Sequence, residues 1–71
     1  MTEGYASPAT RDRFLDALDA GDRALSTELA RNLTQCGNPL PGMTCGQLGL
    51  PIGSTYGSAA RRILLWYSEP Q

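Results

Sequence analysis

Chemically reactive side chains are scarce in this sequence. All six basic residues are arginines and there is no histidine, so the chain lacks the commonest general base, the commonest metal ligand and an amine for Schiff-base formation. Hydroxyl side chains such as Ser54, Thr55 and Ser58 have no base to activate them as nucleophiles. We therefore predict a protein that is not an enzyme and that uses no cofactor, no metal and no small-molecule substrate.

Two cysteines, Cys36 and Cys45, enclose eight residues, a gap too wide for the C-x-x-C spacing of redox and zinc motifs. Two interpretations stay open. In an oxidising compartment a disulfide would close this short loop and contribute roughly 2–3 kcal/mol, whereas in a reducing compartment two small thiols would pack at its ends. Residues 1–10 have no basic or apolar leader, and the longest apolar run, residues 63–67, is far below the roughly 20 residues that span a bilayer. We therefore expect a cytoplasmic protein. Free thiols are favoured, because thiols in that compartment are usually kept reduced.

Carboxylates form a second group of interest. Asp12, Asp16 and Asp19 recur at intervals of three and four residues, which places them on one face of a helix. Such a stripe suits an arginine-rich partner surface, and it is equally compatible with a solvated helix face. It is a poor calcium site, because calcium prefers ligands wrapped in a loop with backbone carbonyls.

An apolar run closes the sequence at residues 63–67. Successive residues of a helix point about 100° apart, so one neighbouring element cannot cover all five side chains. We expect Leu65 or Tyr67 to be partly exposed and Trp66 to anchor the core. Because aromatic residues are enriched at binding hot spots, Leu65, Trp66 and Tyr67 are the predicted contact with a protein partner or with a second copy of the chain.

A further motif runs through residues 44–56, Thr-Cys-Gly-Gln-Leu-Gly-Leu-Pro-Ile-Gly-Ser-Thr-Tyr, and is followed by Arg61-Arg62-Ile63-Leu64. Residues 44–63 resemble the helix-turn-helix of bacterial transcription regulators, in which a small helix ends in Leu-Gly-Leu-Pro and Ser-Thr opens the recognition helix. The resemblance implies an alternative function in DNA binding. The residues that it would place on the major groove are Ser54, Thr55, Tyr56 and Ser58, with Arg61 and Arg62 on phosphate.

Helix start and stop signals divide the first half of the chain. Ser7 and Pro8 predict a helix start, and this helix should continue to about residue 20. Gly21 then supplies a left-handed stop and Asp22 the next N-cap. The second helix is predicted over about 22–35.

The second half begins with a Pro/Gly-rich loop at residues 37–42, because proline disfavours helix in the residue before it. Thr44 and Gln47 have the spacing of a capping box, which predicts a short helix over about 44–48. Ser54 should cap the last helix, over about 55–67. Within it Gly57 costs roughly 1 kcal/mol relative to alanine, so we expect close packing or close approach by a partner at this position.

The whole chain of 71 residues, 41% hydrophobic and 18% charged, is predicted to be one small all-α domain, a bundle of about four helices with flexible ends at 1–6 and 68–71. Its expected function is non-catalytic: a regulatory or adaptor domain that binds its partner through the last helix and the acidic first helix. The expected core consists of Phe14, Leu18, Leu25, Leu29, Leu33, Leu48, Tyr56, Ile63 and Trp66.

Overall fold

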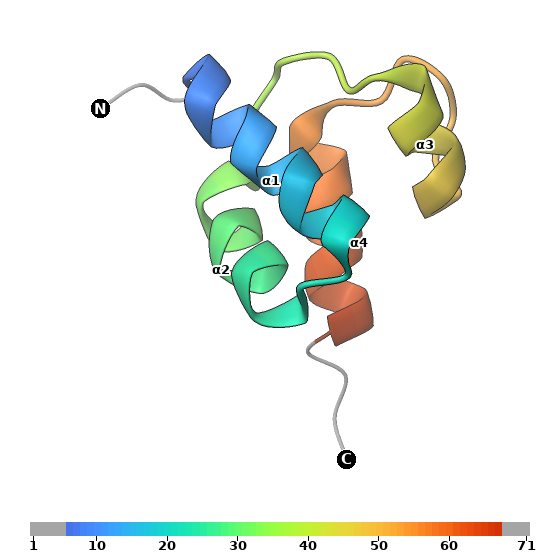
Figure 1. The fold of residues 1–71 in the computed structure, drawn as a ribbon. Helices are drawn as coiled ribbons and strands as arrows, with labels where there is room; N and C mark the ends of the chain where they lie inside the picture. Colours follow the sequence, from blue (N-terminus) through green and yellow to red (C-terminus); the bar gives the residue numbers. More distant parts are fainter. Residues whose placement is uncertain (1–5, 68–71) are drawn as a thin grey trace.

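The computed structural model describes residues 6–67. It contains four helices: α1 (Pro8–Ala20), α2 (Arg23–Leu33), α3 (Gly42–Leu48) and α4 (Tyr56–Tyr67). Within the described range the β-structure is limited to one isolated bridge, between Pro39 and Thr55. The predicted all-α class is therefore confirmed (Figure 1). Of the flexible ends predicted at residues 1–6 and 68–71, residues 1–5 and 68–71 lie outside the described residues. Ala6 is described: it is partly buried, and its amide donates a hydrogen bond to the Asn38 side-chain oxygen.

The first two helices have the predicted end signals. The Ser7 hydroxyl accepts a hydrogen bond from the Thr10 amide, and Pro8 occupies the first turn of α1. Gly21 ends α1 with φ of 71°, a left-handed conformation that costs glycine little. Asp22 then caps α2 through the amide of Leu25. These caps act within one helical turn, so the sequence alone predicts them correctly.

The starts of α3 and α4 differ from the prediction. The first helix-type bond at α3 runs from the Cys45 amide to the Pro41 carbonyl, so α3 begins at Gly42 with no side-chain cap, and the predicted Thr44 capping box is wrong. At α4 the cap is Thr55, whose hydroxyl accepts from the Ser58 amide. The Ser54 hydroxyl instead donates to the Pro51 carbonyl.

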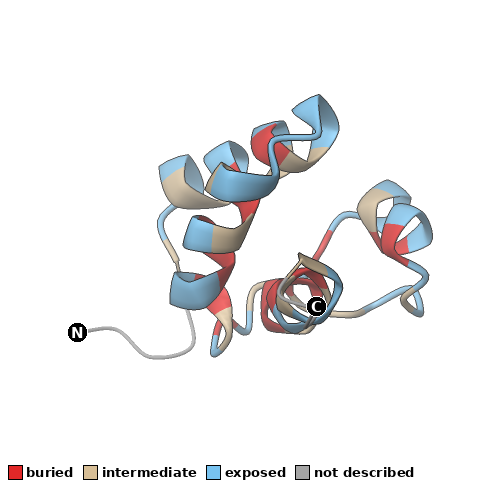
Figure 2. Cartoon of the chain, turned by 90° about the horizontal axis from the view of Figure 1, so that it is seen from below, coloured by how far each residue is buried: buried red, intermediate tan, exposed pale blue. Residues whose placement is uncertain are grey.

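The core lies between the helices, and α2 and α4 share the most extensive contact. Figure 2, which views α4 nearly end-on, shows the buried positions on the faces that the helices turn inward. Of the predicted core, Leu18 and Leu25 are only partly buried, and the prediction for Trp66 is wrong because this side chain is 42% exposed. The buried apolar residues are Phe14, Ala17, Leu29, Ala30, Leu33, Cys36, Leu40, Cys45, Leu48, Tyr56, Ala59, Ala60 and Ile63.

Gly57 marks the point at which α4 meets the end of α2. A Cβ atom on Gly57 would lie 2.8 Å from the Thr34 carbonyl oxygen and 2.9 Å from that of Cys36. The predicted close approach is confirmed, and it comes from the chain's own backbone. Only a residue without a side chain allows this contact, so Gly57 sets how closely α4 packs against the chain that follows α2.

Both cysteines are buried free thiols. The Cys36 thiol donates to the Asn38 side-chain oxygen, and the Cys45 thiol faces the Leu40 carbonyl oxygen at 3.9 Å. Among residues 6–67, no helix is long and apolar enough to cross a bilayer.

Candidate protein-binding surface

The carboxyl-terminal end of α4 carries two neighbouring exposed apolar side chains. Leu65 is 69% exposed and Trp66 is 42% exposed, whereas Ile63, one turn earlier, is completely buried. Leu64 and Tyr67 are partly buried against the core. The expectation that five consecutive apolar residues cannot all be covered is confirmed at Leu65. We name Leu65 and Trp66 the α4 end surface.

Trp66 is left exposed at the end of α4. The start of α2 covers the neighbouring residue instead: the Arg23 guanidinium lies 4.9 Å from the centre of the Tyr67 ring. Trp66 contacts an arginine of its own helix, since Arg62 lies 6.0 Å from the centre of its ring. Cation–π contacts at exposed sites contribute about 0.5–1 kcal/mol. The α4 end surface is thus apolar with a basic margin.

The three aspartates of α1 are all exposed. Within the described part of the chain none of their carboxylates takes part in an ion pair or a hydrogen bond, although Arg11 and Arg13 lie on the same helix. Their charge is therefore not neutralised by a direct contact. Asp12 also acts on α4. Burial raises the pKa of the Tyr56 hydroxyl; the charge of Arg11 opposes this rise, and the charge of Asp12 adds a smaller contribution to it.

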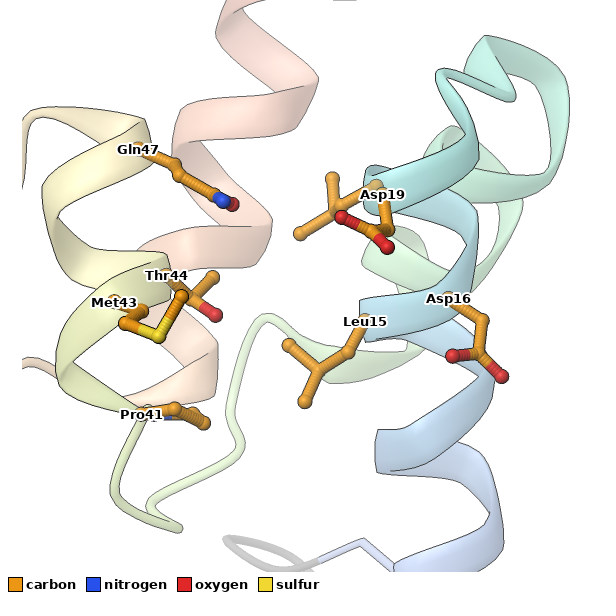
Figure 3. A pocket seen from close by; sticks show the side chains of 8 residues that line it. Leu15, Asp16, Asp19, Pro41, Met43, Thr44 and Gln47 are labelled. Carbon is orange, nitrogen blue, oxygen red and sulfur yellow. The ribbon is translucent and has the colours of Figure 1, made fainter.

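Asp16 and Asp19 border a groove between α1 and α3 that sequence reasoning missed. The groove has a volume of about 250 Å³. In Figure 3 Leu15 and Asp19 point from α1 toward α3, and Asp16 lies at the rim farther from α3. The complete lining is Leu15, Asp16, Leu18, Asp19, Pro41, Met43, Thr44 and Gln47. No sequence signal joins these two segments, because they are far apart along the chain.

The residues that the helix-turn-helix resemblance places on DNA have other contacts here. Tyr56 is only 3% exposed and packs with its ring centre 6.3 Å from that of Phe14, which agrees with its predicted place in the core and leaves little of its side chain accessible to a major groove. Thr55 caps α4, and its hydroxyl lies 3.4 Å from that of Ser58. Ser54, partly buried, is hydrogen-bonded within the preceding turn.

The two arginines of this motif also have contacts within the chain. The Arg61 guanidinium donates a 2.7 Å hydrogen bond to the Thr34 carbonyl oxygen, while Arg62 lies over Trp66. Residues 49–55 separate α3 from α4, a longer connection than the three or four residues that usually join the helices of this motif. Both arginines and Ser54 of the turn therefore already make contacts within the fold.

In residues 6–67 there is no group of three or more His, Cys, Asp or Glu side chains placed to hold a metal ion. Comparison of the chain with family models, with curated proteins and with solved structures finds no match.

Proposed function

We propose that this chain is a non-catalytic, cytoplasmic regulatory or adaptor domain that binds another protein, or a second copy of itself, through the α4 end surface, with the aspartates of α1 helping to orient the partner. The observation that carries the proposal is that Leu65 and Trp66 are exposed although the nearby Ile63 is completely buried in the core.

Burial of these two side chains at an interface would stabilise the complex, because folding of the single chain leaves them exposed. Burying a Leu-sized side chain is worth about 1.5–3 kcal/mol, and tryptophan is among the residues that most often dominate an interface. Trp66 is also pre-positioned, because Arg62 lies over its ring. A partner that covers both residues therefore gains apolar contact without first removing either side chain from the core.

The α1 aspartates contribute in a different way. Exposed charges change orientation and association rate more than affinity. We therefore expect their replacement by asparagine to slow association, most clearly at low salt, while substitution of the α4 end surface raises the dissociation rate.

The test compares the wild-type chain with the double variant Leu65→Ser/Trp66→Ser. Self-association is measured by sedimentation equilibrium over a range of concentrations, and binding to other proteins by selection from a displayed peptide library. The matched control is Ile52→Ser, which removes another apolar side chain that is 78% exposed but lies in the turn after α3. Loss of association in the double variant alone supports the proposal. Association that survives in a folded double variant overturns it.

DNA binding stays the alternative hypothesis. The burial of Tyr56 and the hydrogen bond of Arg61 to the Thr34 carbonyl oxygen both weigh against it, since base contacts need an exposed side chain and phosphate contacts need available positive charge. Binding to random duplex DNA and to a selected-site pool at two salt concentrations tests it, with Arg62→Ala as the variant. Affinity that falls steeply with salt and is weakened by Arg62→Ala would replace the protein-binding proposal.

A further inference from the structure

The groove between α1 and α3 has a mixed lining that restricts what it can bind. Leu15, Leu18 and Met43 supply apolar surface, and Met43 is 82% exposed. Asp16 and Asp19 supply negative charge on the α1 side. The α3 side adds only uncharged polar groups, and none of the lining residues is basic. A ligand that matches this groove has an apolar part and a positive charge.

The size of the groove favours a side chain over a whole small molecule. Small-molecule sites usually enclose about 300–1,000 Å³, whereas this groove has about 250 Å³. A single large apolar side chain fits such a volume, and the rest of its chain would continue over the rim. Methionine has three rotatable bonds and adapts its shape to different partners, so Met43 suits the wall of a groove that accepts a side chain.

The unpaired carboxylates specify the charge of the partner. Asp16 and Asp19 are exposed and neither is ion-paired within residues 6–67. Arginine binds carboxylates through a planar fork of donors and is favoured at interfaces over the strongly hydrated lysine. Because Asp16 lies on the rim farther from α3, it is placed to meet a basic residue that follows the inserted side chain.

We infer that the α1–α3 groove is a docking site for a segment of a partner protein in which a large apolar residue lies within one helical turn of an arginine. The apolar side chain enters between Leu15 and Met43, and the arginine pairs with Asp16 or Asp19. This inference extends the α1 part of the proposed function and does not depend on the α4 end surface, so either can fail without the other.

The experiment uses the full chain and a displayed library of random dodecapeptides. Selected peptides are expected to combine leucine, phenylalanine or methionine with a nearby arginine. One such peptide is then synthesised with a fluorescent label, and its affinity is measured by fluorescence anisotropy. Matched peptides replace its arginine by glutamate or its apolar residue by alanine, and both are expected to lose most of the binding.

Variants of the chain show where on the structure the peptide binds. Asp16→Asn/Asp19→Asn should weaken binding by up to about fivefold, the effect of losing one exposed ion pair, and Met43→Ser should weaken it further. Glu28→Gln is the control for Asp16 and Asp19, because it removes an exposed negative charge from α2, outside the groove. Circular dichroism confirms that each variant is folded.

Four results would overturn the inference. Selected peptides that lack basic residues would remove the charge argument. If the peptide binds the wild-type chain and Asp16→Asn/Asp19→Asn with equal affinity, it binds elsewhere. If Leu65→Ser/Trp66→Ser loses binding, the peptide binds the α4 end surface, in agreement with the proposed function. Competition between the peptide and self-association would show that a second copy of the chain occupies the groove.

Discussion

The backbone amide of Gly57 donates a 2.9 Å hydrogen bond to the carbonyl oxygen of Cys36. This bond joins the first turn of α4 to the chain just after α2, and it is flanked by a second contact, in which Arg61 donates to the Thr34 carbonyl oxygen. Thr34 is the C-cap of α2, and carbonyl groups at the end of a helix have no intrahelical partner, so Arg61 supplies the missing donor there. The packing of α4 on α2 therefore includes directed hydrogen bonds as well as apolar contact.

Gly57→Ala tests this packing. Alanine favours helix over glycine by about 1 kcal/mol, but the added Cβ would lie under 3.0 Å from two backbone oxygens. Overpacking against groups that cannot move costs about 1–3 kcal/mol, so we expect a net loss of stability in urea unfolding. Gly46→Ala is the matched control, since Gly46 lies inside α3 with open space around it, and it should be neutral or stabilising. A Gly57→Ala protein as stable as Gly46→Ala would contradict the predicted steric conflict.

Ser26→Ala should stabilise the protein. Ser26 is 1% exposed, and its buried hydroxyl oxygen has no hydrogen-bond partner among residues 6–67. Removing an unpaired buried hydroxyl ends its desolvation cost, and alanine also favours helix, so we expect a gain of about 0.5–2 kcal/mol. Ser7→Ala is the comparison, because it removes a hydroxyl that caps α1 and should cost about 1 kcal/mol. Thermal unfolding distinguishes the two: a similar loss in both variants would mean that Ser26 has a partner in solution.

Tyr56 should make the protein less stable at alkaline pH. Burial raises the pKa of Tyr56 above its ordinary value of 10.0; Arg11 opposes this rise and Asp12 adds to it. The folded state therefore favours the neutral hydroxyl. Its contribution to stability is complete below the unfolded pKa of about 10 and is lost as pH rises through the higher folded pKa.

Urea unfolding at about pH 8 and about pH 11 measures this dependence. Tyr56→Phe should reduce the alkaline loss of stability, while Tyr67→Phe, at a half-buried position, should retain it. If wild type and Tyr56→Phe lose equal stability between the two pH values, Tyr56 does not titrate as the structure indicates.

Arg61→Ala should destabilise the fold in the absence of any ligand. The variant loses the 2.7 Å bond to the Thr34 carbonyl oxygen and a positive charge at the end of α2, where the helix dipole favours it. The expected cost is about 0.5–1.5 kcal/mol. Arg13→Ala, on the exposed face of α1, is the control and should change stability little. Equal stabilities of the two variants in urea would mean that Arg61 is free in solution and available to a ligand.

Some features of the fold follow from short stretches of sequence. Ser7, Gly21, Asp22 and Gly49 each act on a backbone group within one turn, and a cap needs no distant residue to form. The start of α4 was harder to predict because Ser54 and Thr55 are adjacent hydroxyl residues and both are compatible with an N-cap. The bond from Ser54 to Pro51 leaves Thr55 as the cap.

The α4 end surface could likewise be predicted only in part from the sequence. Exposure of Leu65 or Tyr67 was predicted because a helix cannot turn five successive residues toward one neighbour, and this needs no knowledge of the fold. The structure exposes Leu65. The exposure of Trp66 depends on which element covers the end of α4, and Arg23 at the start of α2 lies over Tyr67 instead. Periodicity gives the relative directions of these side chains, but the position of α2 determines which of them is covered.

The sequence by itself thus determined the all-α class, the limits of α1, the capping of α2 and the exposure of Leu65 or Tyr67, since each depends on contacts or angles within a turn or two. Only the tertiary structure decided the packing of Tyr56 on Phe14, the pairing of Arg61 with Thr34 and the groove between α1 and α3. These features join residues that are distant along the chain, and such residues meet only after the helices have packed.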